Sequence, residues 1–277
     1  MKKIFLFAFS IATAFSSCDK IKFPYAAKSN STSDTSSAKV RKVFIEDYTG
    51  QKCVNCPTAA TTILAIKGIH PKNIVSVAVH CDFYSIPAAA PYTYDFRTTP
   101  GNDYDTYFQP PNFPIGMINR KDYPSNQNWK SVSNWSAIVD SLLAKAPDAT
   151  LTISNNYNST SRVLNTSVKT QFLTPHTSTY KLMVLLTEDS IVSPQKCPPN
   201  IDSLTYVHHH VLRSAISSTS WGDVLTIAGD TSVKAFQYTL PATFNGMAPK
   251  ENYCYVVAYI YDATTYEILQ AEEKKIK

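Results

Sequence analysis

Two cysteines separated by two residues, Cys53 and Cys56, stand between a strand-like and a helix-like segment, and they constrain the fold more than any other feature. The preceding segment, residues 43–48, is rich in β-branched and aromatic residues and predicts a strand. Residues 58–67 have apolar side chains at helical spacing, and Gly68 predicts the end of that helix. The helix N-terminus favours a thiolate on Cys53, and Cys56, one turn on, is close enough to form a disulfide.

The residues that follow predict an α/β arrangement. The apolar run 73–79 is typical of a buried parallel strand and ends in His80 and Cys81. If the two strands are parallel, their C-terminal ends share one edge of the sheet, so His80 and Cys81 are expected near Cys53. The alternative roles are a satisfied histidine at a strand end and a buried small cysteine.

Downstream, residues 82–112 predict a long Pro-rich connection with one short helix at 102–108. Pro114 comes just before another strand-like segment that runs to residue 120. A further helix is expected over 132–146, which would complete a first domain at residues 40–147.

The second half, residues 148–277, predicts an all-β sandwich of immunoglobulin-like type. The expected strands are residues 150–154, 163–170, 180–186, 235–240, 253–261 and 268–274. We find no catalytic constellation in this half. Cys197 and Cys254 are candidates for a disulfide in an oxidising compartment, and free thiols are the alternative. The three adjacent histidines at 208–210 point in different directions, which favours a structural role over a metal site.

The N-terminus predicts export. Residues 1–17 combine a basic start, an apolar run and small residues, as in a secretory signal. Cys18 follows Ser16 and Ser17, so it is a candidate for lipidation; a non-lipidated signal is the alternative. Residues 18–39 would then be a lipidated cysteine followed by a flexible tether, because this stretch is polar and holds too little apolar surface to pack.

Length and charge exclude some classes of function. A chain of 277 residues fits two domains. Without residues 1–17, which hold two lysines and no acid, 24 basic side chains face 21 acidic ones, a net charge of +3. This weak charge argues against a nucleic-acid partner. With only 7 glycines, phosphate-binding loops are not expected, and no metal or other cofactor is predicted.

Two resemblances rest on these residues. Residues 40–147 resemble thioredoxin, in which a cis-proline loop corresponds to Pro114, although Lys52 stands where thioredoxins usually have an aromatic residue. The whole chain resembles the Bacteroidetes lipoprotein family named for the 28-kilodalton outer membrane protein. The matching features are the Cys18 lipobox, Thr49-Gly50-x-x-Cys53-x-Asn55-Cys56-Pro57, Pro114-x-Gly116-x-x-Asn119-Arg120, and the tail from Tyr261 to Ala271. This family resemblance implies an outer-membrane location.

The leading hypothesis is thiol–disulfide exchange on exported proteins by a lipid-anchored protein. Cys53 would form the mixed disulfide and Cys56 would resolve it, while the charge of Lys52 would help to lower the pKa of Cys53. An inert disulfide in a non-catalytic binding or adhesion module is the main alternative, and half of a zinc site is a weaker one. A third hypothesis is an accessory subunit of an outer-membrane complex. The expected partners are proteins, with the membrane reached through Cys18.

Overall fold

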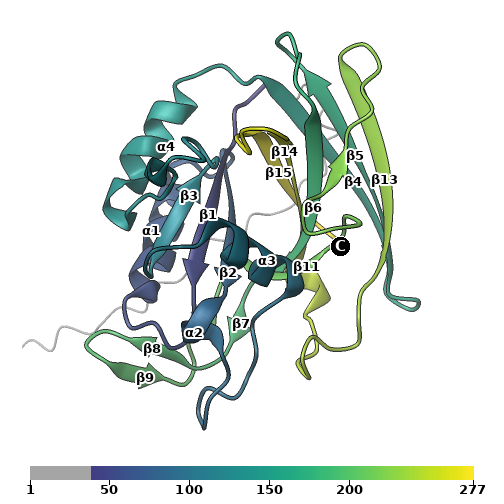
Figure 1. The fold of residues 1–277 in the computed structure, drawn as a ribbon. Coiled ribbons are helices and arrows are strands. Elements are labelled where there is room, and N and C mark those ends of the chain that lie inside the picture. The colour runs from purple at the N-terminus through teal and green to yellow at the C-terminus, as the bar shows by residue number, and fades with distance from the viewer. Residues whose placement is uncertain (1–38) are drawn as a thin grey trace, which may run out of the picture. The chain divides into compact units, whose positions relative to one another are not determined.

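The computed structural model describes residues 39–277 (Figure 1). The predicted signal, Cys18 and nearly all of the predicted tether lie outside the described residues. Up to residue 143 the chain is mixed, with β1 (Val43–Thr49), α1 (Cys56–Ile69), β2 (Ile74–His80), α2 (Asp82–Ser85), α3 (Thr99–Phe108), β3 (Ile115–Ile118) and α4 (Trp135–Leu143). The predicted mixed α/β first half is therefore confirmed, with the last helix shorter than expected.

Many strands follow, as predicted. They are β4 (Ala149–Asn158), β5 (Val163–Phe172), β6 (Tyr180–Glu188), β7 (Ile191–Val192), β8 (Gln195–Cys197), β9 (Ile201–Ser203), β10 (Val207–His208), β11 (Val211–Ala215), β12 (Asp223–Val224), β13 (Thr231–Thr239), β14 (Cys254–Asp262) and β15 (Ile268–Lys275). Three short 3-10 helices complete the described chain: η1 (Asn126–Asn128), η2 (Val132–Asn134) and η3 (Glu251–Tyr253). The six expected strands correspond to the six long ones, and the short strands between residues 191 and 224 were not predicted.

One eight-stranded sheet is the frame of the molecule, in the order β15-β14-β6-β11-β2-β1-β3, with β12 paired to β6 outside this order. β1 and β2 are parallel, with Val43 opposite Ile74 and Thr49 opposite His80. Their C-terminal ends therefore share one edge, as the sequence predicts, and this edge leads into the cysteine motif. β3 is antiparallel to β1.

Apolar side chains cover both faces of this sheet. On one face, buried residues of β1, β2, β6, β14 and β15 pack with Tyr104 and Phe108 of α3. On the other face, α1 and α4 cover β1–β3, and a three-stranded sheet, β13-β5-β4, covers β6 and β14. Figure 1 shows the two helices at one end of the large sheet and the small sheet at the other. Alternating side chains explain the two layers: on β6, Met183 faces α3 and Val184 faces the small sheet.

The boundary expected between residues 147 and 148 does not separate two sheets. Strand β11 of the second half pairs with β2 of the first, with Val211 opposite Ala78. The described chain forms one compact unit. The physical reason is that β2 has an edge that β1 does not fill, and β11 pairs with it while adding Leu212 to the shared core.

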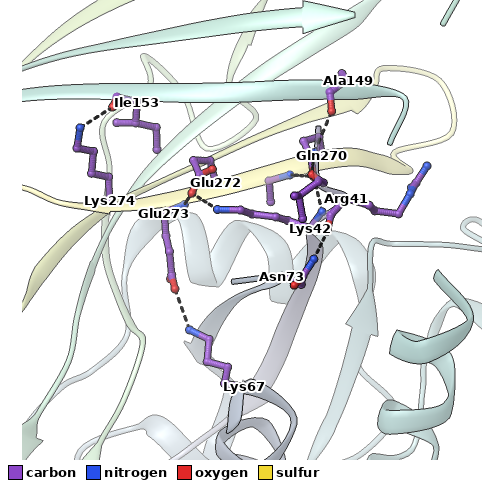
Figure 2. A network of polar contacts seen from close by, with 12 residues as sticks. Arg41, Lys42, Lys67, Asn73, Ala149, Ile153, Gln270, Glu272, Glu273 and Lys274 are labelled. Atoms are coloured by element: carbon purple, nitrogen blue, oxygen red, sulfur yellow. Dashed lines mark hydrogen bonds and ion pairs between the residues drawn. The ribbon is translucent and has the colours of Figure 1, made fainter. Parts of the chain in front are cut away.

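Polar contacts of β15 join the halves a second time (Figure 2). The Gln270 amide donates hydrogen bonds to the carbonyls of Val40 and Ala149, both at 2.9 Å. Lys67 of α1 forms an ion pair with Glu273 at 3.0 Å. The remaining contacts in Figure 2 are Lys42 with Glu272, Asn73 with the Arg41 carbonyl, and Lys274 with the Ile153 carbonyl. β15 thus ties the start of the sheet to the small sheet.

Candidate functional site

The two cysteines of the motif form a disulfide at the start of α1, with Cα atoms 5.4 Å apart. Asn55 is the N-cap residue of α1 and Pro57 lies in its first turn. Proline is favoured there because its missing N–H would have no helical partner in the first turn. Gly50 is tightly enclosed, since a Cβ added to it would lie 2.6 Å from Cβ of Tyr84. The motif therefore places its sulfurs where the sequence predicts, between β1 and α1.

Thiol–disulfide exchange needs a solvent-accessible Cys53, and the structure does not provide one. Cys53 and Cys56 are each 2 % exposed. The hairpin formed by β8 and β9, which the sequence did not predict, covers the motif. Its Gln195 amide donates to the carbonyls of Cys53 at 3.0 Å and Gly50 at 3.3 Å, and the Lys196 N–H donates to the Gln51 carbonyl at 2.8 Å.

Pro114 and Lys52 lie at the edge of the same region. The Phe113–Pro114 bond is cis, as the thioredoxin resemblance implies. Pro114 precedes Ile115, which pairs with Tyr48, so the proline lies near the C-terminal end of β1, where the chain leaves for the cysteines. The Lys52 ammonium lies over the Phe83 ring, 4.5 Å from its centroid. An effect of Lys52 on Cys53 stays a prediction.

Asp47 is a functional candidate that the sequence analysis missed. It is 2 % exposed, and its Oδ1 has no hydrogen-bond partner among residues 39–277. Together with Cys56 it lines a cavity of about 30 Å³. Burial raises the pKa of the Asp47 carboxyl to about 8. The available signal was the acidic pair Glu46 and Asp47 within the strand that leads into the cysteine motif.

His80 lies in the cavity, as its place at the end of β2 predicts, but it is not a satisfied histidine. It is 4 % exposed, its Nδ1 has no partner in the described chain, and burial lowers its pKa. His208 of β10 lines the same cavity, and burial lowers its pKa to about 4. The sequence pattern favoured a structural role for His208–His210. The place of these histidines in the wall of the cavity is therefore a second feature that sequence reasoning missed.

The other three cysteines of residues 39–277 are unpaired. Cys81 is buried, and burial together with the nearby Asp105 raises the pKa of its thiol, which favours the alternative of a buried small residue. Cys197 and Cys254 do not form a disulfide, which favours the alternative of free thiols. Cys254 lies in the core between the two sheets, whereas Cys197 lies on β8, which contacts the motif loop.

Residues 39–277 contain neither a candidate metal-binding group nor a helix that could span a membrane. No three His, Cys, Asp or Glu side chains in this range are grouped so that they could hold a metal ion. None of the helices in the same range is long and apolar enough to cross a bilayer.

Comparisons with known proteins place the chain in a family. HBP35 of Porphyromonas gingivalis has a similar fold, with a TM-score of 0.68 at 15 % identity over 86 % of this chain and 76 % of that one. Protein AGR_C_4864 of Agrobacterium tumefaciens gives a TM-score of 0.50 at 12 % identity, over 87 % and 96 % of the two chains. A domain of the outer membrane lipoprotein Omp28 of P. gingivalis gives 0.36 at 20 % identity, over 47 % and 89 %.

No curated protein matches the chain. The family described as Outer membrane protein Omp28 matches residues 101–277, which is more than half of the sequence. The resemblance drawn from the sequence motifs is therefore confirmed. The protein belongs to the Omp28 family of outer membrane proteins.

Proposed function

We propose that this protein carries out thiol–disulfide exchange on exported proteins at the outer membrane, held there by a lipid on Cys18. In this proposal the first half acts as a thioredoxin-like domain, and the strands of the second half serve as an immunoglobulin-like sandwich. Proteins with accessible thiols are the partners.

The buried Asp47 carboxyl is the observation that carries the proposal. Oδ1 of Asp47 is buried without a hydrogen bond, which costs on the order of 1–3 kcal/mol. A disulfide that serves only as a structural cross-link has no need of a buried acid beside it. A disulfide that opens and closes does, because the leaving sulfur must gain and lose a proton.

The exchange step follows from this arrangement. A substrate thiolate attacks Sγ of Cys53, the Cys53–Cys56 bond breaks, and its electron pair stays on Sγ of Cys56. The Asp47 carboxyl gives its proton to that thiolate. A second substrate thiolate then attacks the substrate sulfur of the mixed disulfide and releases Cys53, so the substrate leaves with a new disulfide and the protein holds two reduced cysteines.

Access to Cys53 requires movement of the β8–β9 hairpin. The hairpin forms three hydrogen bonds with the motif, two from Gln195 and one from Lys196. The Tyr92 hydroxyl also donates to Asp202 of β9 at 2.5 Å, and Lys196 lies over the Tyr92 ring. Each such hydrogen bond contributes about 1 kcal/mol, so opening the hairpin costs a few kcal/mol. Burial of the disulfide beneath this hairpin is also the observation that favours the alternative function, a binding module with a permanently closed disulfide.

Trapping distinguishes the two functions. Cys56→Ser leaves Cys53 as a free thiol without its resolving partner. Its thiolate can attack a disulfide, so this variant is expected to accumulate mixed disulfides with exported proteins that contain disulfides, seen by mass spectrometry. Cys53→Ser is expected to trap little, because Cys56 lies at the cavity behind the motif. Equal absence of trapping in both variants would establish the binding module instead.

The hairpin supplies a second measurement. Gln195→Ala removes two hydrogen bonds from the cover, so reduction of the wild-type disulfide by dithiothreitol is expected to become about tenfold faster, since 1.4 kcal/mol corresponds to a factor of ten. Gln237→Ala on β13, whose amide bonds to Asn165, is the matched control. A Gln195→Ala variant that is reduced at the wild-type rate would contradict the role of the hairpin as a cover.

A further inference from the structure

The cavity beside Cys56 is of a size that suits water. Its volume of about 30 Å³ has room for about two molecules, since one water needs roughly 10–15 Å³ of such space. Its walls come from β1, α1, β2 and the chain around β8 and β10. The wall residues with polar side chains that matter below are Asp47, Ser76, His80, Gln195, Tyr206 and His208.

Besides Nε2 of His210, four buried polar atoms of these walls have no hydrogen-bond partner within the described range: Oδ1 of Asp47, Oγ of Ser76, Nδ1 of His80 and Nε2 of His208. Each of the four residues is at least 96 % buried. One unpaired buried polar atom costs about 1–3 kcal/mol. A water molecule that bridges them can form two to four hydrogen bonds, which removes most of that cost.

The His208 ring is oriented so that Nε2 remains an acceptor. The backbone carbonyls of Ser193 and Pro194 accept hydrogen bonds from this ring. Because Nε2 has no partner, the donor is Nδ1, and Nε2 carries a free lone pair. Neighbouring rings fix this orientation, with centroid distances of 4.8 Å to Tyr206, 4.8 Å to Phe96 and 5.5 Å to His80.

We infer that His208, together with His80, holds a water molecule against the Asp47 carboxyl, and that this water sets how readily Asp47 exchanges its proton with Cys56. The inference rests on the proposed exchange reaction, in which His208 is a positioning residue that contacts the water and not the sulfurs. Once Asp47 has lost its proton, the water donates one hydrogen to the carboxylate and the other to Nε2. This stabilises the ionised carboxylate in a place where bulk solvent cannot.

Other titratable or charged groups also face this cluster. They are Tyr206, His209 and His210 from the chain around β10, and Arg213 of β11, whose charge acts on His80. Cys56 of α1 also lines the cavity but is held in the disulfide. None of them is altered in the His208 variants below, so a change in those variants reports the substituted ring.

Carbon-13 NMR of the aspartate carboxyl carbons tests the inference in the oxidised protein, without turnover. In His208→Phe, which keeps a ring but has no acceptor, the titration midpoint of Asp47 is expected to rise by at least half a pH unit. In His208→Gln the amide oxygen can accept as Nε2 does, so the midpoint is expected to return at least halfway. His176→Phe, whose ring stacks on Phe172 outside the cavity, is the control and is expected to leave the midpoint in place.

Oxygen-17 relaxation of water gives the direct readout. The wild-type protein is expected to show a long-lived internal water signal that decreases in His208→Phe and persists in His176→Phe. An unchanged midpoint in His208→Phe, a shift that His208→Gln does not reverse, or a shift with no loss of water signal would each overturn the inference. If the midpoint and water signals change as expected but Cys53 traps no substrate, the proposed function fails and the water link remains.

Discussion

At the scale of single residues, Asp47 makes folding sensitive to pH. Its pKa is about 8 in the folded protein, compared with about 3.9 in an unfolded chain. Between these values the folded state binds a proton that the unfolded state does not. Raising the pH therefore favours unfolding, and this destabilisation grows until the pH passes the folded-state pKa.

His208 has the opposite sign. Its pKa falls to about 4 on folding, so its contribution to stability is lost as the pH drops below about 6.5. The interval from pH 6.5 to 8 consequently reports mainly on Asp47. Comparison with a variant that lacks only the Asp47 carboxyl cancels what remains of the histidine contribution.

We predict that the unfolding free energy of the oxidised wild-type protein falls between pH 6.5 and 8 by about 2 kcal/mol relative to Asp47→Asn, from 1.36 kcal/mol per pKa unit. Urea denaturation at the two pH values measures this difference. Asp230→Asn is the control, because its side chain is 70 % exposed. Parallel pH dependence in wild type and Asp47→Asn would show that Asp47 is ionised in the folded protein.

Arg120 shows that the role of a single residue can be hidden in the sequence. There it stands out only as part of a family motif, whereas in the structure it is fully buried and forms two hydrogen bonds with Glu46, at 2.8 and 2.6 Å. The Tyr259 hydroxyl accepts a third at 3.0 Å. These partners are 74 and 139 residues away in the sequence, so no local pattern separates a structural arginine from a functional one.

At the scale of elements, local pattern predicts the long strands and helices well and the short ones poorly. β6 and β14 have nine residues each, enough for strand composition to be evident. β8 and β9 have three residues each, and their position depends on contacts with Gly50, Gln51 and Cys53. The cysteine motif was therefore found from the sequence, but its cover was not.

Two glycines provide a matched prediction about elements. A Cβ added to Gly116 of β3 would lie 2.6 Å from both the Glu46 carbonyl oxygen and the Trp135 ring. Gly116→Ala is therefore expected to reduce the unfolding free energy by about 1–3 kcal/mol through overpacking. Gly68 lies within α1 with no atom within 4 Å of an added Cβ, so Gly68→Ala is expected to increase it by about 0.5–1 kcal/mol.

Thermal and urea denaturation of both variants measures these changes. The substitution is the same in both, so a difference between their unfolding free energies comes from the surroundings of the two glycines. A neutral Gly116→Ala would mean that β3 can move away from α4 without loss.

At the scale of the whole molecule, the shared sheet is the feature that the sequence could least predict. Composition and strand spacing favoured two domains, because each half holds enough apolar residues for a core of its own. The main core nevertheless combines Phe44 and Val77 of the first half with Leu185 and Tyr259 of the second. Pairing across 130 or more residues leaves no periodic signal in the sequence.

The shared core leads to a prediction about fragments. A chain of residues 39–147 lacks β11, which pairs with β2, and lacks the β6 and β14 side chains that fill the core around α3. We therefore expect this fragment alone to show no cooperative thermal transition by circular dichroism, and to recover one when it is co-expressed with residues 148–277. As a control, a cut in the exposed turn at residues 159–161 should leave the transition cooperative, because this turn only connects β4 and β5. A cooperative transition of the isolated fragment close to that of the full chain would mean that the first half folds alone and that the second half docks on it as a separate domain.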